Sequence, residues 1–193
     1  MVNQDIWRLK NISSDYDFTL KRLTSQRPLR VLFVGTASVA KGVADLLLAF
    51  ECLGDAPIEL QIVGDRAMTV PERFLHHPRI RWVGRVDRAG VMEHYRAGDL
   101  LIFPSHSDGF GMAQIEAQGW GLPIVASRNC GRVVRDGETG LVLDEVTPAA
   151  IAAALRRVLS EPQTLERFAR RSESAAAPGI DALAAGLIAL ESQ

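Results

Sequence analysis

The sequence predicts an α/β fold built on a doubly wound parallel sheet of about six strands. Three observations favour this fold: short apolar runs alternate with segments of helical periodicity, the connections between them are short, and glycine-bearing loops follow several of the runs. Right-handed crossovers bring the carboxyl ends of all the strands to one edge of such a sheet, and ligands bind beyond that edge.

The elements follow in chain order. Strands are expected over 29–35, 58–63, 80–84, 100–103, 122–126 and 141–143, and helices over 41–53, 87–97, the segment that holds Glu116 up to Gly119, 147–159, 162–172 and 180–191. Asp87 and Thr147 are the expected N-caps of two helices, and Pro148 suits a first helical turn. Residues 1–28 show no clean period and are interpreted as a linker or partly ordered extension, which leaves 29–193 as one globular domain.

The composition argues against several classes of function. A formal net charge of −1 and a pI of about 6.4 give no electrostatic footprint for nucleic acid or an anionic membrane surface. The two cysteines, Cys52 and Cys130, lack metal-ligand spacing, and no metal site is expected. Because no apolar stretch reaches about 18 residues and the amino terminus is polar, we expect a soluble, cytoplasmic protein with free thiols.

The most informative stretch follows the expected fourth strand. Asp108 stands in a polar loop, the segment Gly109–Met112 carries a glycine on each side of Phe110, and a helix then holds Glu116. A helix start has unpaired N–H donors and a partial positive charge, so this order of strand, glycine loop and helix favours an anion above the loop. The stretch therefore predicts a ligand that bears phosphate.

Two carboxylates belong to this stretch. Asp108 and Glu116 are eight residues apart, which corresponds to about 12 Å of helical rise, so they could hold opposite ends of one elongated ligand. Glu116 shares its helix face with mostly apolar residues, and ligand hydroxyls could supply the hydrogen bonds that a buried carboxylate needs. The alternative is structural: Asp108 caps the helix and Glu116 pairs with an arginine.

Two nucleotide-binding motifs are incomplete. The loop after the first strand ends in Lys41-Gly rather than Gly-Lys-Ser/Thr, which disfavours an ATPase. Lys41 can still add a positive charge at a helix start to hold a phosphate, or it can be an ordinary solvated lysine. The Gly-Phe-Gly loop lacks a third glycine and follows the fourth strand rather than the first, which disfavours a nicotinamide enzyme. His106 lies in the same loop as Asp108.

Residues 108–127 read Asp-Gly-Phe-Gly-Met-Ala-Gln-Ile-Glu-Ala-Gln-Gly-Trp-Gly-Leu-Pro-Ile-Val-Ala-Ser. This run resembles the signature of the retaining family 4 glycosyltransferases, the group 1 glycosyl transferases of GT-B fold, in which a Glu, seven residues and a second Glu surround Gly-Phe-Gly. Asp108 takes the place of the first Glu. A Gly-Arg…Lys-Gly element of the family is similar to the segment ending at Lys41, with Thr36 in place of the Arg. The resemblance covers roughly residues 29–172 and implies one half of a GT-B fold, the carboxyl-terminal donor-binding domain.

The resemblance also implies roles for individual residues toward a nucleoside-diphosphate sugar. Asp108 and Glu116 would be the catalytic pair, with Asp108 on the sugar hydroxyls and Glu116 on the ribose. The remaining donor-binding residues would be Lys41 and Thr36 near the diphosphate, Gly109, Phe110, Gly111 and Met112 through their backbone, and Arg85 and Val86 in a loop that faces the base or is a simple turn. The nucleotide sugar would be the substrate, and neither a metal ion nor a further cofactor is implied.

The acceptor half of such an enzyme has no counterpart in the stretch that resembles the family. We therefore expect a donor-binding domain that is inactive alone and that needs an amino-terminal acceptor domain as its partner. The alternative is a stand-alone, non-catalytic module that binds nucleotide sugars. A sugar-nucleotide epimerase of the same fold is disfavoured by the spacing of Asp108 and Glu116 and by the Gly-Phe-Gly loop.

Overall fold

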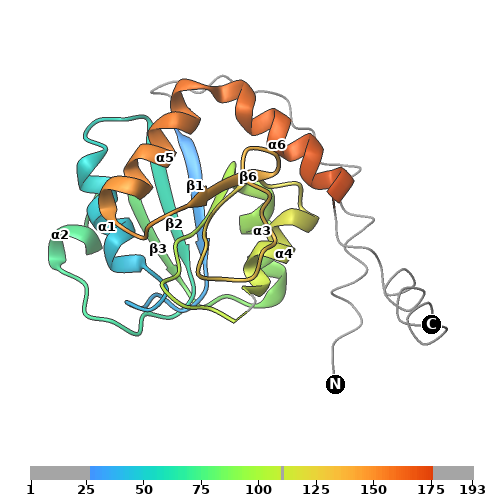
Figure 1. Ribbon diagram of the computed structural model, residues 1–193. Coiled ribbons are helices and arrows are strands. Elements are labelled where there is room, and N and C mark those ends of the chain that lie inside the picture. The colour runs from blue at the N-terminus through green and yellow to red at the C-terminus, as the bar shows by residue number, and fades with distance from the viewer. Residues whose placement is uncertain (1–26, 110, 176–193) are drawn as a thin grey trace.

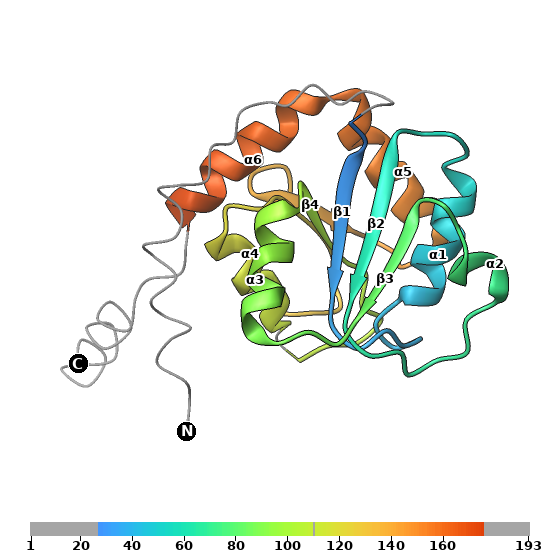
Figure 2. The same ribbon diagram turned by 180° about the vertical axis from the view of Figure 1, so that it is seen from behind.

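The computed structural model describes residues 27–109 and 111–175. Within these ranges parallel strands form a six-stranded sheet in the order β3-β2-β1-β4-β5-β6 (Figures 1 and 2). The strands are β1 (Leu29–Val34), β2 (Ile58–Val63), β3 (Ile80–Gly84), β4 (Leu100–Phe103), β5 (Ile124–Ser127) and β6 (Gly140–Leu143). The doubly wound parallel sheet expected from the sequence is confirmed.

Helices cover both faces of the sheet, as Figures 1 and 2 show from opposite sides. One face carries α1 (Val43–Cys52), α2 (Glu72–Leu75) and α5 (Pro148–Ser160), and the other carries α3 (Arg88–Ala97) and α4 (Met112–Gly119). Helix α6 (Pro162–Ala175) packs against both α5 and α4. None of the helices in the described ranges is long and apolar enough to cross a membrane.

Alternate residues of the strands enter two separate apolar cores. In β1, Val31 and Phe33 face the core under α1 and α5, while Leu32 faces the core under α3 and α4. Strands β4 and β5 are buried throughout. Strands covered on both faces have near-continuous apolar sequences, which is why short apolar runs were sufficient to predict these elements.

Some boundaries differ from the expectation. The first helix begins at Val43 rather than Lys41, because Gly42 has φ 68° and adopts a left-handed conformation. The fifth strand begins at Ile124 rather than Leu122, because the N–H of Leu122 bonds back to Ala117 at 2.9 Å and so closes helix α4. The four-residue helix α2 had no counterpart among the expected elements.

Other local predictions are confirmed. Asp87 accepts a hydrogen bond from the N–H of Gly90 at 2.8 Å, and Thr147 accepts one from the N–H of Ala150 at 3.2 Å, so both are N-caps. The interpretation of residues 1–28 falls almost wholly outside the described residues, as does the helix expected over 180–191. Both stay predictions.

The sheet order creates a topological switch point between β1 and β4. From β1 the chain continues to β2 on one side, and from β4 it continues to β5 on the other. The connections that leave the carboxyl ends of these two central strands therefore lead to opposite sides of the sheet, and doubly wound sheets bind ligands at such a point. The loop over 35–42 follows β1, and the loop that begins at Pro104 follows β4.

Candidate functional site

The loops after β1 and β4 are held together at the switch point. A Cβ on Gly42 would overlap the carbonyl oxygen of Pro104, so only glycine permits this approach of the two backbones. The N–H of His106 donates to the carbonyl oxygen of Ala40 at 2.9 Å. The His106 imidazole Nε2 lies 2.8 Å from Asp45 Oδ2, so this histidine is tied to helix α1.

Lys41 and Asp108 form an ion pair across these loops. The ammonium Nζ of Lys41 contacts Asp108 Oδ2, and it lies 5.7 Å from the centroid of the Phe103 ring. The Asp108 side chain is only 14% exposed, and its backbone N–H donates to Asn129 at 3.1 Å. The structure thus brings together two of the residues expected in the site. Lys41 is not simply solvated, and Asp108 does not cap helix α4.

Helix α4 begins beside this pair. Its N-cap is Gly111, with φ 73°, and a Cβ there would lie 2.9 Å from the Phe103 ring. Glycine has no side chain to cap the helix, although its carbonyl oxygen accepts from the N–H of Gln114 at 2.9 Å. The start of α4 is therefore suited to an anion. Met112 begins the helix and is exposed, whereas Gly109 precedes the gap at Phe110, which lies outside the described residues.

Glu116 lies on α4 and is half-buried. Its carboxylate Oε2 accepts a hydrogen bond from the Tyr95 hydroxyl of α3 at 2.8 Å. Burial and the neighbouring carboxylate raise the pKa of Tyr95 well above its usual value, so the phenol stays a protonated donor. This partner is a tyrosine rather than the arginine of the structural alternative. Sequence reasoning did not single out Tyr95, because a tyrosine in a helical pattern reads as core.

The remaining expected residues follow β1 and β3. Arg85 donates through Nε to Asp65 Oδ2 at 2.9 Å, and its guanidinium holds the pKa of the Asp65 carboxyl below the usual value. Val86 packs against the core under α3 and α4. Thr36 is exposed in the first loop, where its neighbour Ala37 donates to the carbonyl oxygen of Asp65 at 2.7 Å. Arg85 and Val86 therefore stand at the same edge as the Lys41 pair but two strands away.

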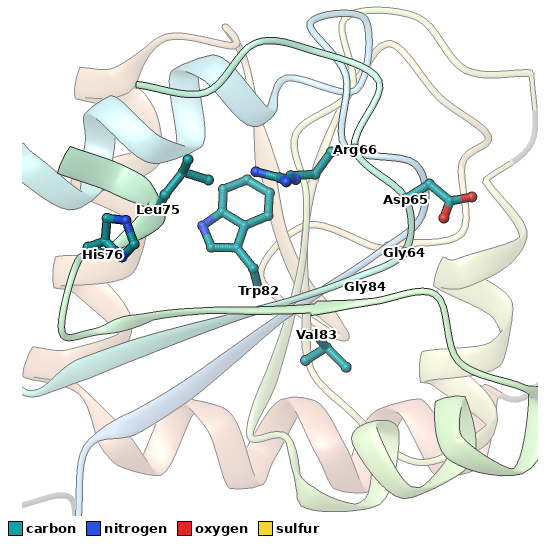
Figure 3. Close-up of a pocket in the computed structure, with 8 residues that line it drawn as sticks. All are labelled: Gly64, Asp65, Arg66, Leu75, His76, Trp82, Val83 and Gly84. Carbon is teal, nitrogen blue, oxygen red and sulfur yellow. The ribbon is translucent and has the colours of Figure 1, made fainter. Parts of the chain in front are cut away.

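A hollow of about 530 Å³ lies beside the Arg85 loop (Figure 3). It is lined by Gly64, Asp65, Arg66, Leu75, His76, Trp82, Val83 and Gly84. The Arg66 guanidinium carbon lies 5.8 Å from the Trp82 ring centroid, and the Asp65 carboxylate points away from that ring (Figure 3). Lys41, Asp108 and Glu116 do not line this hollow, so it is separate from the residues at the switch point.

A buried polar network supports the loop that carries Asp108. The Ser127 hydroxyl donates to the carbonyl oxygen of Ser105 at 2.5 Å and accepts from the N–H of Asn129 at 3.3 Å. The Cys130 thiol donates to the carbonyl oxygen of Ser127 at 3.0 Å, and burial raises the pKa of this thiol. These contacts hold the segment after β5 against the segment after β4. The bond from Ser127 to Ser105 joins segments far apart in the chain, and no local pattern predicts it.

Metal ligation has no support among residues 27–109 and 111–175. No group of three or more His, Cys, Asp and Glu side chains gathers there in a way that could hold an ion. His106, the histidine nearest the carboxylates in sequence, is paired with Asp45. That the protein needs no metal stays a prediction.

Known proteins resemble this chain in sequence and in fold. The family described as "Glycosyl transferases group 1" matches residues 28–161. The D-inositol 3-phosphate glycosyltransferase of Geodermatophilus obscurus is 34% identical over 168 residues, which cover 75% of this chain and 36% of that protein. The chain thus spans about a third of the length of this relative.

Solved structures share the fold of this chain. The sucrose-phosphate synthase of Thermosynechococcus elongatus superposes with a TM-score of 0.72 at 26% identity, over 89% of this chain and 46% of that one. The Anabaena protein HepE, solved in complex with UDP, gives a TM-score of 0.68 at 20% identity, over 100% of this chain and 53% of that one. With a family match over most of its length and this fold, the chain belongs to the group 1 glycosyl transferases, which have the GT-B fold.

Proposed function

We propose that residues 29–193 form the donor-binding domain of a retaining glycosyltransferase and bind a nucleoside-diphosphate sugar. One observation carries the proposal: Lys41, Asp108 and the start of helix α4 meet at the switch point between β1 and β4, with Glu116 farther along that helix. The lysine cation and the N–H donors at the helix start suit the phosphates of such a ligand, and the Glu116 carboxylate suits hydroxyls at its other end. The fold shared with HepE, which was solved with UDP, supports a uridine nucleotide as the first ligand to test.

The diphosphate would lie between Lys41 and the start of α4. Lys41 supplies the ammonium, and the backbone from Gly109 to Met112 supplies N–H donors. In the free protein Lys41 is already paired with Asp108. An incoming diphosphate therefore competes with a carboxylate for this cation. Thr36, which stands where the family has an arginine, offers a hydroxyl in place of a second positive charge.

The nucleoside would lie along α4 toward β3. Glu116 would accept hydrogen bonds from the ribose hydroxyls, and charge-assisted bonds of this type are stronger than neutral ones. The backbone at Arg85 and Val86 would face the base. Asp65 links the two loops: its side chain pairs with Arg85, and its carbonyl oxygen accepts from the N–H of Ala37 in the loop after β1. This contact supports the placement, because it holds the loop after β3 near the loop proposed to bind the diphosphate.

The sugar would lie above Asp108, in the direction of the acceptor. Asp108 is one methylene shorter than the family's Glu, so its carboxylate reaches about 1.5 Å less far. Its pairing with Lys41 supports a place at the boundary between the diphosphate and the sugar. As in other enzymes of two facing domains, transfer would need an acceptor domain from outside residues 29–193, and this domain alone would transfer nothing. The cytoplasmic location favoured by the sequence stays a prediction.

A thermal-shift series tests this proposal. A ligand that binds only the folded state raises the unfolding midpoint, and a concentration of 100 times Kd adds about 2.7 kcal/mol of apparent stability. We expect UDP or GDP at millimolar concentration to raise the midpoint, with or without magnesium. If no nucleoside diphosphate moves the midpoint, the donor-binding assignment is wrong.

A further inference from the structure

Tyr95 is a fully buried tyrosine whose hydroxyl meets Glu116. Its ring belongs to the core between the sheet and helices α3 and α4, with 1% of the residue exposed. The hydroxyl oxygen lies 2.8 Å from Glu116 Oε2 and 3.4 Å from the carbonyl oxygen of Ala113. A phenylalanine would fill nearly the same space, so what the hydroxyl adds is a hydrogen bond.

The phenol has one hydrogen to donate, and its two acceptors are unequal. The Glu116 carboxylate is both closer and charged, which makes it the stronger acceptor. The Ala113 carbonyl is a second acceptor within reach, so the buried hydroxyl keeps a partner when Glu116 is substituted. Burial and the carboxylate raise the Tyr95 pKa, which keeps the hydrogen on the phenol oxygen.

This contact restricts the side chain of Glu116. A glutamate on a helix loses rotamer entropy when a ligand fixes it, and an anchor already present in the free protein lowers that cost. A carboxylate has about four acceptor sites. Tyr95 uses one of them and leaves the others for ligand hydroxyls.

We propose that Tyr95 is a positioning residue that orients Glu116 to receive the two ribose hydroxyls of the nucleotide. The inference rests on the proposed function, in which Glu116 is the ribose-binding residue. It assigns to helix α3 a part in donor binding, although Tyr95 itself is buried beneath the site.

Tyr95→Phe tests the inference, because it removes the hydroxyl and keeps the ring. Calorimetric titrations of the full chain with UDP and with 2′,3′-dideoxy-UDP separate a ribose effect from a general one. We expect Tyr95→Phe to bind UDP up to about tenfold more weakly, the upper end of the cost of ordering one long side chain on binding, and dideoxy-UDP within about twofold of wild type. In a Glu116→Ala background, Tyr95→Phe should cause no further loss.

Ser172→Ala is the matched control, since Ser172 is also fully buried and its hydroxyl also donates to a backbone carbonyl, that of Thr139. It should leave UDP affinity unchanged. Equal losses for UDP and dideoxy-UDP in Tyr95→Phe, or wild-type affinity for both, would overturn the positioning role while leaving nucleotide binding intact. If the wild-type chain binds neither ligand, the proposed function fails, and this inference fails with it.

Discussion

The ion pair of Lys41 with Asp108 and that of Arg85 with Asp65 both stand at the carboxyl edge of the sheet, and they differ in burial. The side chains of Lys41 and Asp108 are 31% and 14% exposed, whereas those of Arg85 and Asp65 are 80% and 45% exposed. Exposed pairs contribute little, because water and salt screen them. Partly buried charges interact more strongly and cost more when one partner is removed.

The pair of Lys41 and Asp108 is also more tightly surrounded than the pair of Arg85 and Asp65. Lys41 and Asp108 lie where backbones approach too closely for any residue but glycine at position 42, and Phe103 flanks the ammonium. Arg85 and Asp65 lie beside an open hollow. Charge alone therefore does not mark the site. The pair held by the fold at the switch point is the one expected to govern diphosphate binding.

Lys41→Ala should have the largest effect. It removes the cation proposed for the diphosphate and leaves the Asp108 carboxylate unpaired where the phosphates would lie, so we expect UDP affinity to fall on the order of 30-fold. Arg85→Ala removes an equal charge from the exposed pair and should change UDP affinity by no more than about threefold. Calorimetry on both variants checks the contrast. Similar losses would show that the two pairs are equivalent and that net charge, not placement, binds the ligand.

Glu116→Gln and Asp108→Asn distinguish the roles of the two carboxylates within the site. We expect Glu116→Gln to weaken UDP binding about tenfold, because ribose hydroxyls lose a charged acceptor. Asp108→Asn should not weaken the binding of bare UDP, because it removes the carboxylate that competes with the diphosphate for Lys41. Both variants keep the side-chain shape, so each is the other's control. Equal losses of UDP affinity would contradict the separate roles.

Asp108→Asn should act on the sugar instead. We expect it to reduce the extra affinity that a UDP-sugar has over UDP, by up to about tenfold if a charge-assisted hydrogen bond to a sugar hydroxyl is lost. Paired titrations with UDP and a panel of UDP-sugars measure this difference. If both kinds of ligand lose affinity equally, Asp108 serves to hold its loop through Lys41 and has no contact with the sugar.

The smallest expected effect is on thermal stability, and it comes from the exposed pair of Arg85 and Asp65 as the pH changes. Arg85 lowers the pKa of Asp65 in the folded chain. A lowered folded pKa contributes stability above the unfolded pKa of about 4, and this contribution is lost as pH falls through the folded value. Arg85→Ala should therefore lower the thermal midpoint slightly at pH 7, and the difference should vanish at about pH 2 or in 1 M salt. A difference that persists in acid would mean that Arg85 stabilises the fold by packing.

The fold could be predicted from the sequence because its signals are local. Apolar runs, helical periodicity and the caps Asp87 and Thr147 each involve a few adjacent residues, and the parallel sheet follows from their alternation. The boundary at Gly42 was missed because its left-handed conformation serves a contact with Pro104, which is 62 positions farther along the chain. Short helices such as α2 contain too few residues to show the helical periodicity from which a helix can be predicted.

The site was predictable by residue but not by contact. Lys41, Asp108 and Glu116 were named from motif and spacing, yet the pairing of Lys41 with Asp108 spans 67 positions and depends on the register of β1 beside β4. The Tyr95 contact depends on how α3 and α4 pack. A tyrosine is common on the buried face of a helix. The sequence therefore cannot distinguish a tyrosine that only packs in the core from one whose hydroxyl also binds Glu116.

The position of bound UDP can be mapped by nuclear magnetic resonance, which tests whether the ligand lies at the start of α4. In an isotope-labelled sample, backbone amide resonances report each residue as UDP is added. We expect the largest shifts at Gly109, Gly111 and Met112 and in the loop over 35–42, with smaller ones at Arg85 and Val86. Shifts concentrated around Trp82 and His76, with the amides at the start of α4 unchanged, would place the ligand in the hollow beside β3 and contradict the account.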